Sequence, residues 1–161
     1  MTIQIPVIKR SPSITILKAW LLAGTLDILS AFTHYYLKTG KHPFNVLNFV
    51  AGGIFGKEAF TGGAIMQLTG LGLHYLFALL WTLVFFKTGP EILRTVKSTV
   101  VAGLLYGMLV WVFMNFVVVP ASALPAAPFN FTNAMVAMLI IMFAVGLPIA
   151  IIEGKYFRER N

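Results

Sequence analysis

Four long apolar stretches constrain the fold of this chain more than any other feature of its sequence. Each is close to the roughly 20 residues that a helix needs to cross a bilayer. We call them spans one to four, and they cover residues 14–37, 62–86, 96–119 and 131–152. Because lipid cannot satisfy backbone N–H and C=O groups, and because the stretches are continuous instead of alternating, we expect helices and not barrel strands. The sequence therefore predicts an all-α integral membrane protein, with residues 1–161 forming a single domain in which four transmembrane helices make a bundle.

Basic residues are distributed unevenly over the segments that flank these spans. Nine of the twelve Lys and Arg residues lie around the start of span one, between spans two and three, or after span four, and only Lys38, Lys41 and Lys57 lie between spans one and two. Since cytoplasmic loops carry the excess of Lys and Arg, we expect both termini in the cytoplasm and the protein in the inner (plasma) membrane. Lys18 and Glu153 fall near the inner membrane boundary, and we interpret both as snorkelling interfacial residues.

The segment of residues 39–61 is too polar for the membrane core and too apolar to be free in water. Pro43 can occupy a first helical turn. Apolar residues then recur on one helical face: Phe44, Leu47, Ala51 and Ile54. We expect a short amphipathic helix here, lying on the outer face between the first two transmembrane helices. The glycines of the segment leave open a re-entrant element that lines a cavity.

Span one carries an acidic residue, Asp27, near its middle. A carboxylate at this depth costs on the order of 3 kcal/mol, so it must face protein or water and not lipid. The small and polar residues of the span share its side of the helix: Trp20, Ala23, Gly24, Asp27, Ser30, Ala31 and His34. Span two has a similar face: Gly63, Gln67, Gly70, His74, Ala78 and Trp81. At ~1.5 Å of rise per residue, Asp27 and His74 reach a similar depth near the midplane and can meet.

Three further polar residues, His34, Gln67 and Asn115, reach the outer third of the bilayer by the same arithmetic. Together with Asp27 and His74 they form a predicted polar seam. We expect this seam to bind a ligand or to transfer protons. In a buried pair of a carboxylate and an imidazole, the charge of each group is stabilised mainly by the other. A purely structural role stays open, because such groups also fix helix register through interhelical hydrogen bonds of about 0.6 kcal/mol each.

Glycines predict where the helices approach one another closely. Gly103 and Gly107 form a GxxxG pair in span three, which permits backbone contact between membrane helices. Gly24 and Gly146 lie on the faces of spans one and four that we expect to pack. Pro148 is expected to kink span four.

The sequence contains few signs of catalysis or of a bound cofactor. It has no cysteine, which excludes thiolate catalysis and iron–sulfur ligation. His34 and His74 differ in depth by roughly 10 Å, so they cannot hold one haem, and no cluster has metal-ligand spacing. We expect neither a metal nor another cofactor. No Ser-His-Asp set, phosphate-binding loop or carboxylate pair is recognisable. His42, Lys57 and Glu58 are the only candidates for acid and base groups at the interface.

The chain resembles a group of small uncharacterised bacterial inner-membrane proteins, and it is distantly similar in layout to the YagU-like membrane proteins. The features that carry the resemblance are residues 23–27 (AGTLD), the Gly-rich segment before span two, His74, residues 103–107 (GLLYG) and residues 114–120 (MNFVVVP). The resemblance implies four membrane helices and no established activity.

Three hypotheses for the function remain. The leading one is a non-enzymatic membrane protein that binds or conducts a small solute or protons along the polar seam. The alternative is a scaffold or assembly subunit that binds a partner helix through the face of Gly103 and Gly107. The third is a lipid- or quinone-linked enzyme. We expect the lipid bilayer as a partner, and a homo-oligomer or a membrane partner protein is left open. The net charge of +7 is spread over loops and not along an aromatic-rich soluble stripe, so no nucleic-acid partner is expected.

Overall fold

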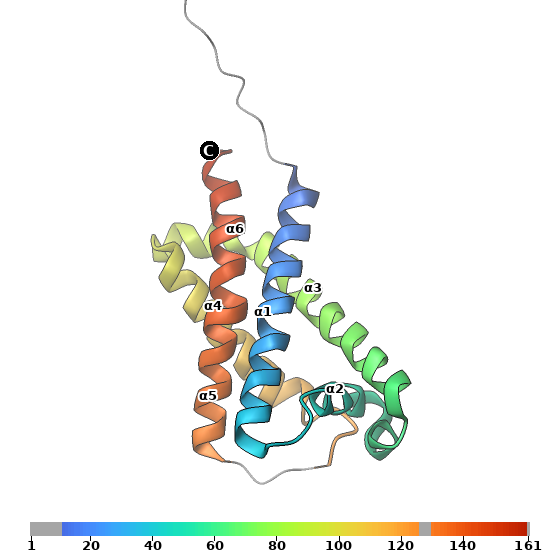
Figure 1. The fold of residues 1–161 in the computed structure, drawn as a ribbon. Helices are drawn as coiled ribbons and strands as arrows, with labels where there is room; N and C mark the ends of the chain where they lie inside the picture. Colours follow the sequence, from blue (N-terminus) through green and yellow to red (C-terminus); the bar gives the residue numbers. More distant parts are fainter. Residues whose placement is uncertain (1–10, 126–129, 161) are drawn as a thin grey trace, which may run out of the picture.

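The computed structural model describes residues 11–125 and 130–160, and all regular secondary structure in these ranges is helical (Figure 1). Lys9 and Arg10, two of the basic residues counted above, lie outside the described residues. In chain order the elements are α1 (Pro12–Thr39), α2 (Asn45–Phe55), the 3-10 helix η1 (Gly56–Phe60), α3 (Gly63–Val96), α4 (Thr99–Phe113), the π-helical η2 (Met114–Val118), α5 (Phe131–Ile141), the π-helical η3 (Met142–Gly146) and α6 (Leu147–Arg158).

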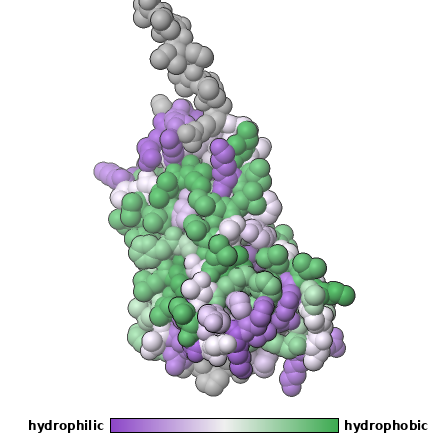
Figure 2. Space-filling view, viewed as in Figure 1, coloured by the Kyte–Doolittle hydropathy of each residue, from purple (hydrophilic) through white to green (hydrophobic). Residues whose placement is uncertain are grey.

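Four helical stretches of the described chain are long and apolar enough to cross a membrane. They are Pro12–Thr39, Gly63–Val96, Thr99–Val118 and Phe131–Arg158. Large apolar side chains cover their outer surfaces, and Leu22, Leu29 and Leu80 are 46%, 53% and 48% exposed. Figure 2 shows the resulting apolar belt, with hydrophilic residues gathered toward the two ends. Such a surface is stable in lipid and not in water, so the architecture is that of a multi-pass membrane protein.

The second long helix extends further than its apolar stretch suggests. We expected span two to end at residue 86, but α3 continues to Val96 and contains Pro90. A proline removes one backbone hydrogen bond. The neighbouring Gly89 leaves room for rings: a Cβ there would lie 2.8 Å from the Phe85 ring and 3.0 Å from the Phe157 ring. Tertiary packing therefore supports a helical extension that hydropathy does not mark.

The last membrane helix contains a π-helical turn close to the proline at which we expect a kink. The turn, η3, comes directly before Pro148, which lies in the first turn of α6. A proline ring collides with the carbonyl group four residues earlier in a regular helix. A π-helical turn is a common local adjustment in membrane helices that contain proline. The irregularity thus lies one turn before the proline, at the residues that contact α4.

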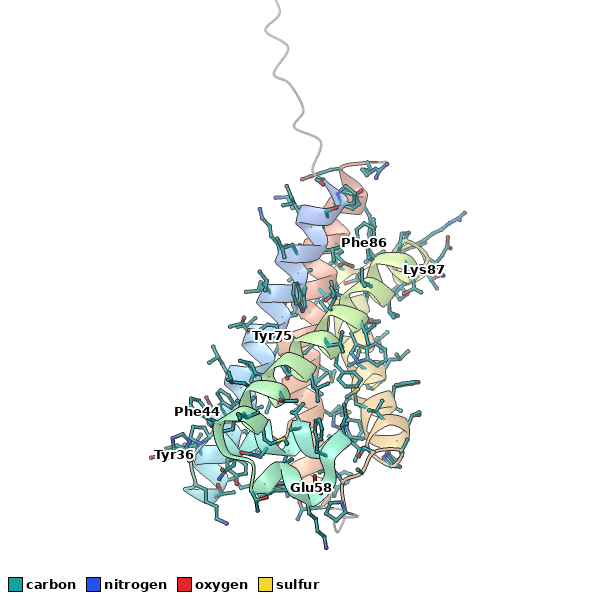
Figure 3. All side chains as sticks on the ribbon, turned by 90° about the vertical axis from the view of Figure 1, so that its right-hand side faces the viewer. Tyr36, Phe44, Glu58, Tyr75, Phe86 and Lys87 are labelled. Carbon is teal, nitrogen blue, oxygen red and sulfur yellow. The ribbon has the colours of Figure 1, made fainter. Side chains whose placement is uncertain are left out.

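The helices pack closely at one level and spread apart toward the α2 end (Figures 1 and 3). α1 lies beside α6, α4 packs on η3 and α6, and α3 crosses them at a steep angle. The buried cluster where they meet consists of Ala23, Phe85, Tyr106, Val110, Val145, Ile149 and Ala150. Beyond it, α2 packs on α3, where a Cβ on Gly70 would overlap the backbone oxygen of Leu47. The spreading helices and α2 enclose the space in which the candidate site lies.

Candidate functional site

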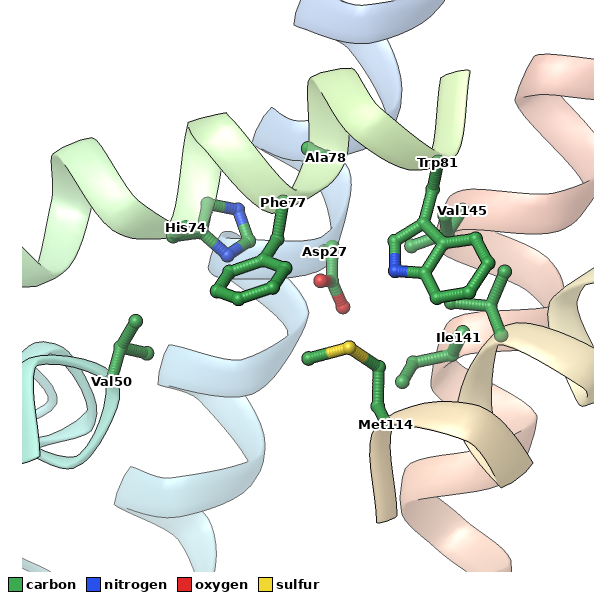
Figure 4. Close-up of a pocket in the computed structure, with 10 residues that line it drawn as sticks. Asp27, Val50, His74, Phe77, Ala78, Trp81, Met114, Ile141 and Val145 are labelled. Atoms are coloured by element: carbon green, nitrogen blue, oxygen red, sulfur yellow. The ribbon is translucent and has the colours of Figure 1, made fainter. Parts of the chain in front are cut away.

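A cavity of about 150 Å³ lies between the helices just beyond the buried cluster (Figure 4). We call it the Asp27 cavity. Its walls come from every membrane helix and from α2: Asp27, Val50, His74, Phe77, Ala78, Trp81, Val110, Met114, Ile141 and Val145. Only Asp27 and His74 among these residues carry a titratable side chain. The cavity is therefore an apolar chamber with one acidic and one basic group in its wall.

Helix packing directs Asp27 into this cavity. Ala23 and Gly24, one turn earlier on the same face of α1, are buried, and a Cβ on Gly24 would lie 2.9 Å from the Tyr75 ring of α3. Leu22 and Leu29, on the opposite face, are exposed. Figure 4 shows the carboxylate pointing into the space between α1 and α3. The close contact of α1 with α3 thus keeps the acidic group away from lipid.

His74 joins α3 to α1 beside this carboxylate. Its Nε2 lies 2.8 Å from the backbone oxygen of Gly24. A carbonyl oxygen only accepts, so Nε2 carries the proton and donates it, and Nδ1 of a neutral ring keeps a lone pair. Asp27 and His74 interact electrostatically. Within the described residues no hydrogen bond or ion pair joins them, and none reaches the Asp27 carboxylate from elsewhere. The two residues therefore line the same cavity, as predicted, but they are not directly bonded to each other.

Trp81 supplies a further polar group to the cavity wall. Its Nε1 is buried and has no hydrogen-bond partner among the described residues. Figure 4 shows the indole on the far side of the cavity from His74. Two contacts fix the position of Trp81. The Tyr106 hydroxyl donates to the Trp81 backbone oxygen at 2.5 Å, and the centroids of the Trp81 and Phe113 rings lie 5.4 Å apart. The sequence placed Trp81 on the same face as His74, but gave no sign that its N–H would lack a partner.

The other three residues of the predicted seam lie elsewhere. Gln67 donates from Nε2 to Asn48 Oδ1 at 3.3 Å, and Asn48 in turn donates to the Ala59 oxygen at 2.6 Å, so this pair ties α3 to α2 and η1. Asn115 donates to the Trp111 backbone oxygen at 2.9 Å. His34, on α1, is half-buried. None of the three lines the Asp27 cavity.

Asn115 borders a second and larger cavity, of about 890 Å³, at the α2 end of the molecule. Phe49 and Phe60 form part of its wall, as do Trp111 and Asn133. Trp111 Nε1 is a second indole N–H without a partner among the described residues. The residues of the predicted seam are therefore separated. Asp27 and His74 line the Asp27 cavity, Asn115 borders the larger cavity, and Gln67 bonds to α2.

The predicted packing glycines of spans three and four meet one another. A Cβ on Gly103 would lie 2.9 Å from the Ala150 Cβ and from the Leu147 Cα, and a Cβ on Gly107 would lie 2.5 Å from the Met142 Cα. A Cβ on Gly146 would overlap the Gly103 oxygen. The GxxxG face is therefore occupied by η3 and α6 of the same chain.

Glu153 is buried inside the protein, so its interpretation as a snorkelling residue is wrong. The side chain is 0% exposed, and neither carboxylate oxygen has a hydrogen-bond partner in the part of the chain that the structure describes. It lies on the face of α6 that carries Ala150 and Tyr156, both of them buried. The helix rotation set by the glycine contacts turns this face inward. Lys18, by contrast, is exposed.

The residues considered for interfacial acid and base chemistry lie apart from both cavities. His42, Lys57 and Glu58 are exposed, and Figure 3 shows Glu58 at the α2 end. In the described part of the chain, no three His, Asp or Glu residues are grouped closely enough to hold a metal ion.

No protein-family model, curated protein or solved structure matches the chain. The resemblance to small bacterial inner-membrane proteins stays a prediction. The function is therefore argued from the site alone.

Proposed function

We propose that this chain is an inner-membrane protein that binds, and in a full cycle conducts, a small solute through the Asp27 cavity. The four long helices form a bundle with both termini in the cytoplasm. Two observations support this orientation: the excess of Lys and Arg in the loops assigned to the cytoplasm, and the end of the molecule at which those loops lie. Lys87 lies toward the same end of the molecule as the start of α1, and Glu58 lies toward the other (Figure 3).

In this proposal α2 is an amphipathic helix at the outer interface. Leu47, Asn48 and Ala51 are buried against the rest of the molecule. Phe49, on the opposite side of α2, and Ile54, near the end of the helix, are 46% and 59% exposed. An apolar exposed side suits the acyl and headgroup boundary better than water. In that position α2 covers the outer mouth of the Asp27 cavity through Val50.

One observation carries the functional proposal. Asp27 points into a chamber whose described residues give its carboxylate no hydrogen bond. A carboxylate retained only to fix helix register would bond to a neighbouring helix, as Gln67 does to Asn48. An ionisable residue inside a membrane helix that faces a cavity marks a binding or conduction site. We therefore assign Asp27 the role of contacting the solute.

The test is a flux and binding comparison with Asp27→Asn, which removes the charge and keeps the shape. Flux of protons, potassium, small ammonium ions and small neutral amphiphiles is measured with purified protein in liposomes. Binding of the same solutes is measured as the shift in melting temperature of the protein in nanodiscs. We expect at least one solute to show flux or stabilisation that Asp27→Asn abolishes. Glu58→Gln, the same change at an exposed site outside the cavity, is the control. Equal behaviour of wild type and Asp27→Asn toward every solute would contradict the proposal.

The scaffold hypothesis has less support. It requires a free glycine face on span three, whereas Gly103 and Gly107 approach the chain's own Leu147 and Met142 to within backbone contact. A partner helix would have to bind through another surface.

A further inference from the structure

We infer that the solute of the Asp27 cavity is a small primary alkylammonium ion, with its charged head at Asp27 and His74 and its hydrocarbon tail among the apolar walls. The inference rests on the function proposed above and specifies the chemical class of the solute. It follows from four properties of the cavity: its charge, the number of hydrogen-bond acceptors, the walls and the volume.

The charge of the cavity selects a cation. Among the described residues, Asp27 is the only acidic one in its wall, and no Lys or Arg lines it. A carboxylate inside a membrane protein is destabilised unless a counter-charge lies close to it. His74 is the one basic side chain among the described wall residues, and it bonds to the Gly24 oxygen without a direct hydrogen bond to Asp27. A bound cation would supply the missing partner, and an anion would be repelled.

The acceptors of the cavity match an ammonium group that carries three hydrogens. The Asp27 carboxylate offers two oxygens, and His74, when its ring is uncharged, offers the Nδ1 lone pair that remains after Nε2 donates to Gly24. A primary ammonium group has three N–H donors, one for each of these acceptors. A quaternary ammonium ion has no N–H group and would leave all three unused.

The remaining walls do not suit a Ca²⁺ or Mg²⁺ ion. Ca²⁺ takes about six to eight oxygen ligands and Mg²⁺ about six, and the described residues of the cavity wall offer one carboxylate. The other wall residues are apolar or aromatic, and they suit a hydrocarbon tail. The wall also contains the Phe77 and Trp81 rings, and an aromatic ring face attracts a cation.

The volume limits the length of the tail. The cavity measures about 150 Å³. A dry cavity of about this volume holds one benzene molecule, which has roughly six heavy atoms. An alkylammonium ion with about four or five carbons therefore fits, and a tetraalkylammonium ion with butyl chains does not.

The experiment uses the full chain in nanodiscs and four probes added as simple salts or solutes: n-butylammonium, tetrabutylammonium, potassium and 1-butanol. Titration calorimetry and melting are recorded for wild type, Asp27→Asn, Val50→Phe and Glu58→Gln. Val50→Phe keeps Asp27 but fills the cavity from α2. The melting of each variant without probe shows whether it is folded, and subtracting the Asp27→Asn signal removes partitioning of the probe into lipid.

We expect n-butylammonium to bind wild type and Glu58→Gln alike, and to lose affinity by about tenfold or more in Asp27→Asn and in Val50→Phe. The other three probes should give no signal that depends on Asp27. Binding of potassium, 1-butanol or tetrabutylammonium that depends on Asp27 and equals that of n-butylammonium overturns the assignment of the solute and leaves the proposed function standing. If no probe and no solute of the flux panel depends on Asp27, both fail, and the cavity holds water only.

Discussion

The backbone of Gly146 lies against that of Gly107, so that a Cβ added to Gly146 would be 2.5 Å from the Gly107 nitrogen. This contact joins the π-helical turn η3 to α4 at the level of the buried cluster. Because neither residue has a side chain, the two helices touch through their backbones. The contact also sets the rotation of α6, and with it the inward direction of Glu153.

The first prediction concerns this contact. Gly146→Ala should lower the free energy of unfolding by about 1–3 kcal/mol, because the added methyl group meets backbone atoms that cannot move away easily. Gly72→Ala is the matched control, since Gly72 also lies inside a membrane helix but no described residue outside its own stretch of helix comes within 4 Å of an added Cβ. Reversible unfolding in mixed micelles measures both. Equal stability of the two variants would show that the close approach is absent.

The second prediction concerns the attachment of α2. Asn48 is 5% exposed and donates to the Ala59 oxygen, while it accepts from Gln67. Asn48→Ala leaves a buried carbonyl group unpaired, at a cost of about 1–3 kcal/mol. Hydrogen exchange in nanodiscs should then rise over residues 45–60 and stay unchanged in α1. Asn45→Ala, at the start of the same helix, is the control. A rise that is equally large in both variants would argue against a specific role of Asn48.

The third prediction concerns Glu153, whose two carboxylate oxygens are buried without a hydrogen-bond partner among the described residues. Replacing a buried, poorly paired ionisable residue by an apolar one of similar volume is often neutral or stabilising by about 1–4 kcal/mol. Glu153→Leu should therefore melt at a higher temperature than wild type, and Glu153→Gln, which keeps polar atoms at the same place, should not. Destabilisation by Glu153→Leu alone would show that the carboxylate has a partner.

The fourth prediction tests the orientation in the membrane. The chain contains no cysteine, so single cysteines can be introduced without background. Thr61 and Thr95 form a matched pair, because both are exposed and both donate to a nearby backbone oxygen. On intact cells a membrane-impermeant maleimide should label Thr61→Cys and not Thr95→Cys. Labelling of the second alone would reverse the proposed topology.

Several features of the fold follow directly from the sequence. Hydropathy over about 20 residues is enough to mark the four membrane helices, because the cost of exposing backbone to lipid leaves few alternatives. The depth of Asp27 and of His74 follows from counting residues along a helix, and the structure brings these two to one cavity.

Other features were decided only by the tertiary structure. Position along each helix predicts Glu153 at the inner boundary and groups Gln67 and Asn115 with Asp27 in one polar seam, but the direction of a side chain depends on how each helix is tilted and rotated. Those angles are set by contacts between distant residues, such as Gly70 with Leu47 and Gly146 with Gly103. The sequence by itself determined how many helices cross the membrane and which of them carries the acidic group. The three-dimensional packing decided which polar groups share a cavity, because glycine-mediated contact fixes helix rotation and no one-dimensional pattern records it.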